Sequence, residues 1–235
     1  MHVSAKMLTF CAAGGAAVVA VAGCGSSAPS TSGSTTQPSA AQLQSSMKQS
    51  VQHASSVHVA GHGTSNGVPV TLDMNLTRSG DVSGTVTENG APFQIIAVNG
   101  KVYGKVTKAF LQQEKAPAAA CSLICGKWLQ LPSAQGKQLT EVAGGLNLKN
   151  LTGELNQAPK LTKSGTTTVA GQPAYVLKDT KGTTVAVQTT PSHYPLRLTS
   201  AGAAKQQLTF SKWNSAPQPV APPKNQVVNL SQLTK

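Results

Sequence analysis

Among the side chains of this 235-residue sequence that could do chemistry are two cysteines four positions apart, Cys121 and Cys125. Such a pair can form a disulfide, supply half of a zinc site or exchange thiols with a substrate. No second cysteine pair or nearby histidine completes a zinc site, and a redox pair is more usually Cys-x-x-Cys. If the chain is exported, a question that residues 1–24 address below, we expect a structural disulfide, and closing so short a loop contributes about 2 kcal/mol.

The histidines and carboxylates form no pattern typical of catalysis or metal binding. The sequence has 7 acidic residues and no motif of paired carboxylates. His58 and His62 lie on an expected strand, where four residues span about 13 Å, too far for both to bind one metal ion. No Gly-x-Ser-x-Gly, His-Glu-x-x-His or phosphate-loop motif is present. We predict no catalytic residue, no metal site and no cofactor, and expect a protein that is not an enzyme.

A third kind of chemistry is indicated by Cys24, which ends an apolar run behind a basic start. The uncharged stretch 7–21 would be about 22 Å long as a helix; it is too short to cross a membrane and typical of a signal-peptide core. Val21-Ala22-Gly23-Cys24 resembles the bacterial lipobox, whose cysteine receives a diacylglycerol and becomes the first residue after cleavage. Cys11 does not fit that pattern. The alternative is an ordinary secretory signal with an incidental cysteine.

The charge of the chain is strongly positive, with 19 basic and 7 acidic residues and a formal net charge of +12. Only Arg78 and Arg197 are arginines, the lysines are scattered, and aromatic residues make up 4%. Nucleic-acid binding calls for a basic stripe with arginine and stacking aromatics, so we expect no nucleic-acid partner. Scattered lysines suit a surface beside anionic lipid or cell-wall polymer. The Ser, Thr, Gly and Pro of 25–39 indicate a flexible linker.

The elements that would position a site begin with a helix over 40–54. In it Leu43, Met47 and Val51 recur every four residues, and Ser39 is the expected N-cap. The period then becomes two, as in strands that bury one face, and Asn99-Gly100 predicts a two-residue hairpin turn. The predicted elements of this half are strands over 57–64, 68–77, 82–88, 93–98 and 101–106, a short helix over 108–115 and a short strand over 128–131.

The second half of the chain repeats the change from helix to strand. The segment 134–157 predicts one or two helices, separated at Gly144-Gly145. A second set of strands is predicted at 166–170, 174–178, 183–188, 196–199 and 207–212, followed by a Pro-rich surface tail over 215–225. The predicted fold class is α+β, with a long antiparallel sheet of about ten strands and helices on one face.

Three groups of segments carry a family resemblance through their order along the chain. They are Val102-Tyr103-Gly104-Lys105 with Phe110 and Gly126-Lys127-Trp128, then 171–177, then 193–198 with 210–213. In this order they resemble the mycobacterial LppX/LprG lipoprotein family. The resemblance implies a LolA-like half-barrel, in which a curved sheet carries helices on its concave face around an apolar cavity. Characterised members bind or carry acylated lipids or lipoglycans at the cell envelope, so the same role is implied here.

The resulting prediction has three regions: a signal peptide at 1–23, Cys24 with its linker to residue 39, and one LolA-like lipid-binding domain at 40–235. We expect a monomer on the extracytoplasmic face of the bacterial cell membrane, held by a diacylglyceryl anchor and binding lipid or lipoglycan. The predicted apolar lining is Val70, Leu72, Met74, Phe93, Ile95 and Leu198. The alternative is a lipid-anchored partner-binding or sensory module with a filled core and no ligand.

Overall fold

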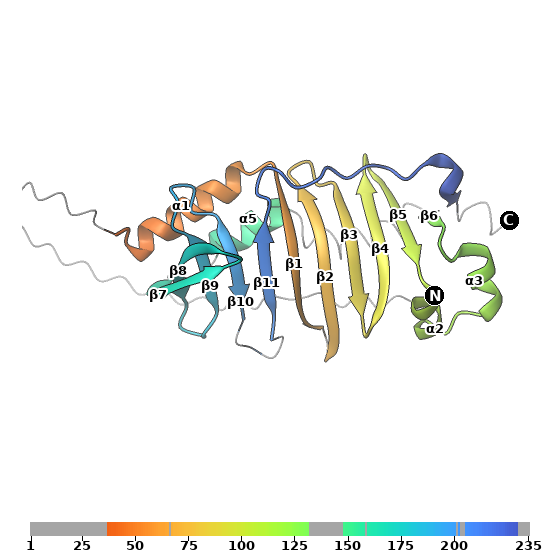
Figure 1. The fold of residues 1–235 in the computed structure, drawn as a ribbon, viewed down its shortest axis with the longest axis horizontal. Coiled ribbons are helices and arrows are strands. Elements are labelled where there is room, and N and C mark those ends of the chain that lie inside the picture. Colours follow the sequence, from red (N-terminus) through yellow and green to blue (C-terminus); the bar gives the residue numbers. More distant parts are fainter. Residues whose placement is uncertain are drawn as a thin grey trace, which may run out of the picture.

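The computed structural model describes residues 37–65, 67–131, 148–157, 159–200, 202 and 205–229. Within these ranges the chain forms one sheet of 12 strands, with helices on one face and at one end (Figure 1). The predicted α+β class and the largely antiparallel sheet are confirmed, with twelve strands instead of about ten.

The first half of the sheet is a meander of strands that follow one another along the chain. They are β1 (Ser56–Ser65), β2 (Val68–Thr77), β3 (Val82–Glu88), β4 (Ala91–Val98), β5 (Lys101–Val106) and β6 (Trp128–Gln130). Asn99 and Gly100 join β4 to β5 with φ angles of 51° and 72°, the positive pair that a type I′ turn requires. The bounds of β2, β3 and β5 are those predicted from the alternation.

The second half is a similar meander that returns toward the first. It consists of β7 (Thr162–Val169), β8 (Gln172–Lys178), β9 (Thr184–Gln188), β10 (Pro195–Thr199) and β11 (Gln207–Ser211). The two meanders join where β11 pairs with β1, from His58 opposite Ser211 to His62 opposite Gln207. The order across the sheet is therefore β6-β5-β4-β3-β2-β1-β11-β10-β9-β8-β7, antiparallel throughout. β7 begins four residues before its predicted start.

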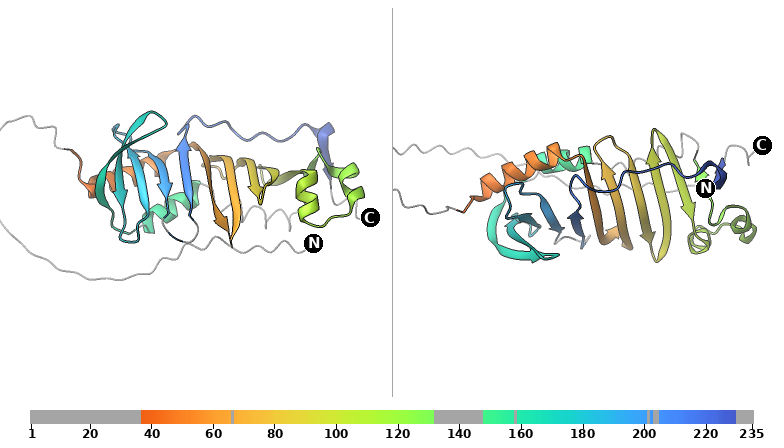
Figure 2. Two further views of the ribbon diagram at one scale, coloured as in Figure 1. Left: turned by 60° about the horizontal axis from the view of Figure 1, so that its bottom comes forward. Right: turned by 45° about the horizontal axis from the view of Figure 1, so that its top comes forward.

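Two helices lie on one face of the sheet, α1 (Ala40–His53) and α5 (Leu148–Gln157). Ser39 begins α1 with a capping box: its side chain accepts from the Gln42 N–H, and the Gln42 side chain accepts from the Ser39 N–H, as helix starts favour. Figure 2 shows α1 and α5 side by side along the half of the sheet that the second meander forms. Of the one or two helices predicted over 134–157, the part after Gly144-Gly145 is present as α5; residues 134–147 lie outside the described residues.

Two further helices lie at the opposite end of the sheet from the start of α1 (Figure 1). They are α2 (Lys108–Gln113), which was predicted, and α3 (Ala118–Ile124), which was not. Thr107 caps α2 by accepting a hydrogen bond from the Phe110 N–H at 3.2 Å. No side chain of α3 is buried.

The Pro-rich segment after β11 crosses the ends of β1 to β5 and reaches the far edge of the sheet (Figure 1). There a 3₁₀ turn (Lys224–Gln226) leads into β12 (Val227–Asn229), which pairs in parallel with β6. Ala216, Pro219 and Pro222 are buried along the way. The segment therefore lies over the surface as expected, but it also adds an edge strand that was not predicted.

The core lies between the sheet and the helices. We call the face of the sheet that carries Val59, Met74 and Ile95 the inner face, because these buried residues form one cluster with the apolar stripe of α1. Leu43, Met47 and Val51 of that stripe have no exposed surface. The opposite, outer face carries mostly Thr, Ser, Gln and His, as alternation in an antiparallel sheet dictates.

Candidate functional site

All six residues predicted to line a cavity lie on the inner face. The register places Leu72, Val86 and Phe93 in one row across β2, β3 and β4. Met74, Gly84 and Ile95 form the next row. On the other side, Leu198 of β10 lies opposite Leu208 of β11. Leu208 lies opposite Gly61 of β1, which in turn lies opposite Leu72 of β2. Val70 precedes Leu72 by two residues and so points the same way.

Burial divides these six residues into two groups. Met74 and Ile95 are 1% and 2% exposed and belong to the core cluster. Val70, Leu72, Phe93 and Leu198 are half-buried, and Leu72 and Leu198 pack against the same cluster. The Phe93 ring also contacts the Phe110 ring of α2, with 5.1 Å between their centroids. The inner face is thus tightly covered in its middle and partly open along the Leu72 row.

A pocket of about 30 Å³ opens at the partly open end of the inner face. It is lined by His62, Gly63, Thr64, Ser65, Val70, Leu72, Gln206 and Leu208. Two of the predicted lining residues, Val70 and Leu72, are therefore brought together with Leu208 of β11. A pocket for a small-molecule ligand is usually about 300–1,000 Å³, so this one holds only water-sized groups.

Sequence reasoning did not include Val86 and Gly84 in the site. Val86 lies between Leu72 and Phe93, and the spacing of Val82 and Val86 by four residues along β3 was a signal for it. Gly84 lets the Met74 side chain lie across β3: a Cβ there would come within 2.6 Å of the Met74 sulfur and 2.1 Å of the Asp73 carbonyl oxygen. No side chain larger than hydrogen fits at that point.

Hydrogen bonds tie α1 to the segment just before β7 and to the turn between β2 and β3. The Gln44 side chain of α1 donates to the Pro159 carbonyl at 3.1 Å and accepts from the Leu161 N–H at 3.3 Å. Arg78 donates to the Ala54 and Val51 carbonyls at the end of α1, at 2.7 and 3.1 Å. Both ends of α1 are therefore held, one by residues beside α5 and the other by the turn after β2.

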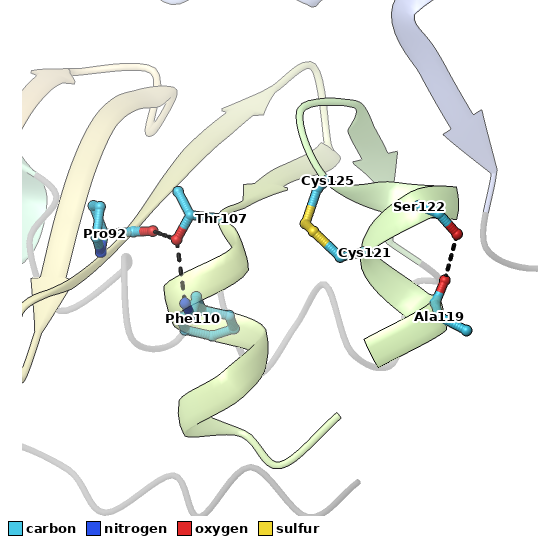
Figure 3. Close-up of a disulfide and its surroundings, with 7 residues drawn as sticks. All are labelled: Pro92, Thr107, Phe110, Ala119, Cys121, Ser122 and Cys125. Carbon is cyan, nitrogen blue, oxygen red and sulfur yellow. Dashed lines mark hydrogen bonds between the residues drawn. A yellow bond between two sulfur atoms is a disulfide. The ribbon is translucent and has the colours of Figure 1, made fainter. Parts of the chain in front are cut away.

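The predicted cysteine bridge closes the end of α3. Cys121 and Cys125 are joined by a disulfide with an S–S distance of 2.06 Å (Figure 3). Beside it Thr107 donates to the Pro92 carbonyl at 2.9 Å and so fixes the start of α2 against β4. Leu123, between the two cysteines, is 61% exposed. The other predicted cysteine site, Cys24, lies outside the described residues.

The register places both histidines of β1 on the outer face, although His62 also borders the small pocket at the end of the strand. His58 shares a hydrogen bond of 3.0 Å between its Nδ1 and the Asn75 Oδ1, and its Nε2 is 3.8 Å from a carboxylate oxygen of Asp73. His62 is exposed. Among the described side chains, no group of three His, Cys, Asp or Glu residues is placed to hold a metal ion.

Comparison with known proteins identifies the fold. No family model matches the sequence, and no curated protein matches it. LprF from Mycobacterium bovis aligns with 78% of this chain and 96% of its own, with a TM-score of 0.57 and 13% identity. The chain has the fold of LprF. The family resemblance seen in the sequence is thus confirmed for the fold.

Other solved structures are more distant. A conserved protein from Thermus thermophilus covers 81% of this chain and 98% of its own at a TM-score of 0.36 and 10% identity. MucB covers 80% of this chain and 61% of its own at a TM-score of 0.35 and 18% identity.

Within the described ranges, no helix is both long and apolar enough to span a bilayer.

Proposed function

We propose that this chain is an envelope lipoprotein that binds the acyl chains of a lipid or lipoglycan against the inner face of its sheet. The observation that carries the proposal is the shared fold with LprF over 78% of the chain, together with the family resemblance of the sequence. In this proposal Cys24 carries the diacylglyceryl anchor after removal of 1–23, and the domain works as a monomer at the extracytoplasmic surface of the membrane.

The inner face has the chemistry that an acyl chain requires. Leu72, Val86 and Phe93 form a half-buried apolar row beside the small pocket. Each methylene that such a surface removes from water contributes about 0.8 kcal/mol, so a few chain carbons in contact give measurable affinity. The pocket of about 30 Å³ is far smaller than an acyl chain. Binding therefore requires α1 and α5 to move away from the sheet, as lids do in other binding proteins.

A second candidate function has an observation of its own. Leu43, Met47 and Val51 of α1 are fully buried against the sheet, so the protein's own side chains occupy the middle of the inner face. A lipid-anchored module that binds a partner protein and takes no lipid fits this packing without any movement of α1. The two candidates differ in whether the inner face ever holds a foreign apolar chain.

Native mass spectrometry of the full chain, extracted with mild detergent, tests the two candidates. Val70→Trp places a large side chain at the mouth of the inner pocket, and Thr71→Trp places the same side chain on the exposed outer face of the same strand. We expect lipid of defined mass to co-purify with the wild type and with Thr71→Trp, and the bound fraction to fall at least about tenfold in Val70→Trp.

The control variant separates lipid binding in the fold from adsorption. An equal bound fraction of lipid in both tryptophan variants would mean that lipid adsorbs to the surface, and would contradict the proposal. Wild-type chain that stays empty after incubation with envelope lipid extract would favour the partner-binding module. The near-ultraviolet circular dichroism of both variants verifies that the sheet is intact.

A further inference from the structure

A second pocket, of about 160 Å³, lies on the outer face of the second meander. Its lining comes from four neighbouring strands: Thr167 of β7, Val176 of β8, Thr184 and Ala186 of β9, and Arg197 and Thr199 of β10. Arg197 and Thr199 flank Leu198, which faces inward, so the strand turns them to the opposite face. The pocket is therefore separated by the sheet from the proposed acyl site. We propose that it binds a phosphate group.

Two bulges lie in strands that form the pocket. One lies between Lys163 and Gly165 of β7, and the other between Pro195 and Arg197 of β10. A bulge bends its strand and increases the local twist, and Figure 2 shows β7 and β8 curving out of the plane of the remaining strands. A small apolar cluster packs within this curve: Val169, Ala174, Ala186 and Leu196. Ala186 belongs both to this buried cluster and to the lining of the pocket.

Four polar side chains line the pocket and have hydrogen-bonding capacity to spare. Arg197 extends from β10 toward β7, where its Nη2 donates to the Thr168 carbonyl at 3.5 Å. A guanidinium has five N–H donors, and within the described ranges this is its one protein hydrogen bond and it has no ion pair. In the same ranges the hydroxyls of Thr167, Thr184 and Thr199 make no hydrogen bond to protein. One guanidinium and three hydroxyls are therefore available to a ligand.

The charge around the pocket favours an anion. None of its six lining residues is acidic. The carboxylate of the β8–β9 turn, Asp179, accepts from the N–H groups of Lys181 and Thr183, both at 2.8 Å, and so serves the turn. Lys178 pairs with Thr184 in the register and adds a second positive charge on this face. A net positive pocket with donors on several strands selects an oxyanion.

Among oxyanions, the donor arrangement fits phosphate better than carboxylate. The planar fork of arginine binds two phosphate oxygens in parallel, and hydroxyls of the lining, such as those of the neighbouring Thr184 and Thr199, can donate to another oxygen. A carboxylate has only two oxygens in one plane and would leave such donors unused. A volume of about 160 Å³ is below the range for whole drug-sized ligands. It suits a phosphate with a few attached atoms, whether free or part of a lipid headgroup.

Amide NMR titration of the full chain in non-ionic detergent, with inorganic phosphate and with acetate at equal ionic strength, tests this site. We expect saturable phosphate-induced shifts confined to β7–β10 and none that saturate with acetate. Arg197→Gln should weaken phosphate binding at least about tenfold, because charge and fork are both lost. Thr199→Val keeps the shape of the side chain and should weaken it a few-fold. Lys181→Gln removes the same charge from the adjacent turn and should change affinity less than about twofold.

Glycerol phosphate distinguishes the two sources of the group. Affinity at least about tenfold above that of inorganic phosphate assigns the pocket to a headgroup, and equal affinity assigns it to free phosphate; both results support a phosphate site. Non-saturating shifts with phosphate, equal losses in Arg197→Gln and Lys181→Gln, or saturable binding of acetate alone would overturn it. Because this pocket and the inner face are separate, the lipid-binding result can fail without affecting this one.

Discussion

Met47 shows how closely the middle of the inner face is packed. It lies at the centre of the α1 stripe with no exposed surface, in the cluster that includes Met74 and Ile95. A side chain in such a position is either core or the removable cover of a binding site. The energy needed to remove it distinguishes the two.

Truncation of Met47 measures that energy. Met47→Ala should lower the free energy of unfolding by about 2–5 kcal/mol, through lost burial and the cavity left behind. Gln49→Ala, on the exposed side of the same helix, should change it by less than about 0.5 kcal/mol. Urea unfolding followed by circular dichroism provides both values. A loss below about 1 kcal/mol for Met47→Ala would show that α1 is already loosely held.

Arg78 has a separate role, at the end of the same helix. Its guanidinium donates to the Val51 and Ala54 carbonyls in the last turn and at the C-cap of α1, where carbonyls lack the full set of partners found inside a helix. Arg78→Gln should cost about 1 kcal/mol, and Arg78→Lys should recover part of it. The comparison is made by urea unfolding against Lys212→Gln, an exposed basic residue. Equal effects of Arg78→Gln and Lys212→Gln would contradict a role in ending α1.

At the scale of elements, α3 depends on its disulfide more than the sheet does. The helix has seven residues and buries none of them, and isolated helices of that length are unstable in water. The cross-link should therefore stabilise α3 locally instead of the whole domain, although closing a five-residue loop contributes about 2 kcal/mol on the chain-entropy estimate.

Replacing both cysteines tests this difference. Cys121→Ser with Cys125→Ser should increase amide hydrogen exchange in α3 by at least about tenfold. The free energy of global unfolding should change by less than about 0.5 kcal/mol. Amides of β4, which α2 contacts, are the internal control. A global loss near 2 kcal/mol, the full chain-entropy value, would show that α3 unfolds together with the sheet.

The strands that could be predicted are those in which apolar and polar residues alternate along the sequence. β2 alternates over its whole length, and its predicted bounds are correct. β7 has the sequence TKSGTTTV, with no apolar residue until its last position, so its first half gave no pattern to detect. β12 has three residues and is held by its pairing with β6. Such a strand depends on contacts between distant parts of the chain.

The candidate site follows the same division. Alternation was sufficient to place all six predicted residues on one face, because side chains in a strand point to opposite faces in turn. It could not show that Met74 and Ile95 are covered while Leu72 and Phe93 are half-exposed, since the cover comes from other elements. The outer pocket was not predicted because its lining comes from four strands, and the two bulges in these strands have no local pattern in their threonine-rich sequence.

For the whole molecule, the proposed anchor determines where the domain works. Cys24→Ser should release the exported chain from the membrane fraction of a bacterial host, because two acyl chains supply the durable attachment. Cys11→Ser changes a cysteine in the predicted signal peptide and should leave the chain in that fraction. Fractionation with mass spectrometry of the N-terminal peptide measures both. Retention of Cys24→Ser in the membrane fraction, without acylation, would contradict the anchor.

The pairing of β1 with β11 has a consequence for how the chain acquires this structure. Apart from β1–β11 and β5–β6, each antiparallel pair consists of strands that are consecutive in the chain and joined by a short turn. Such hairpins form within microseconds. The β1–β11 ladder instead joins His62 to Gln207 and His58 to Ser211. The long chain segment between these residues must therefore lose entropy before the hydrogen bonds of the ladder can stabilise it. We expect this seam to set the refolding rate. Newly exported chains would then pass through a state with two preformed half-sheets and bare central edges, the stage most exposed to proteases and to pairing with other chains.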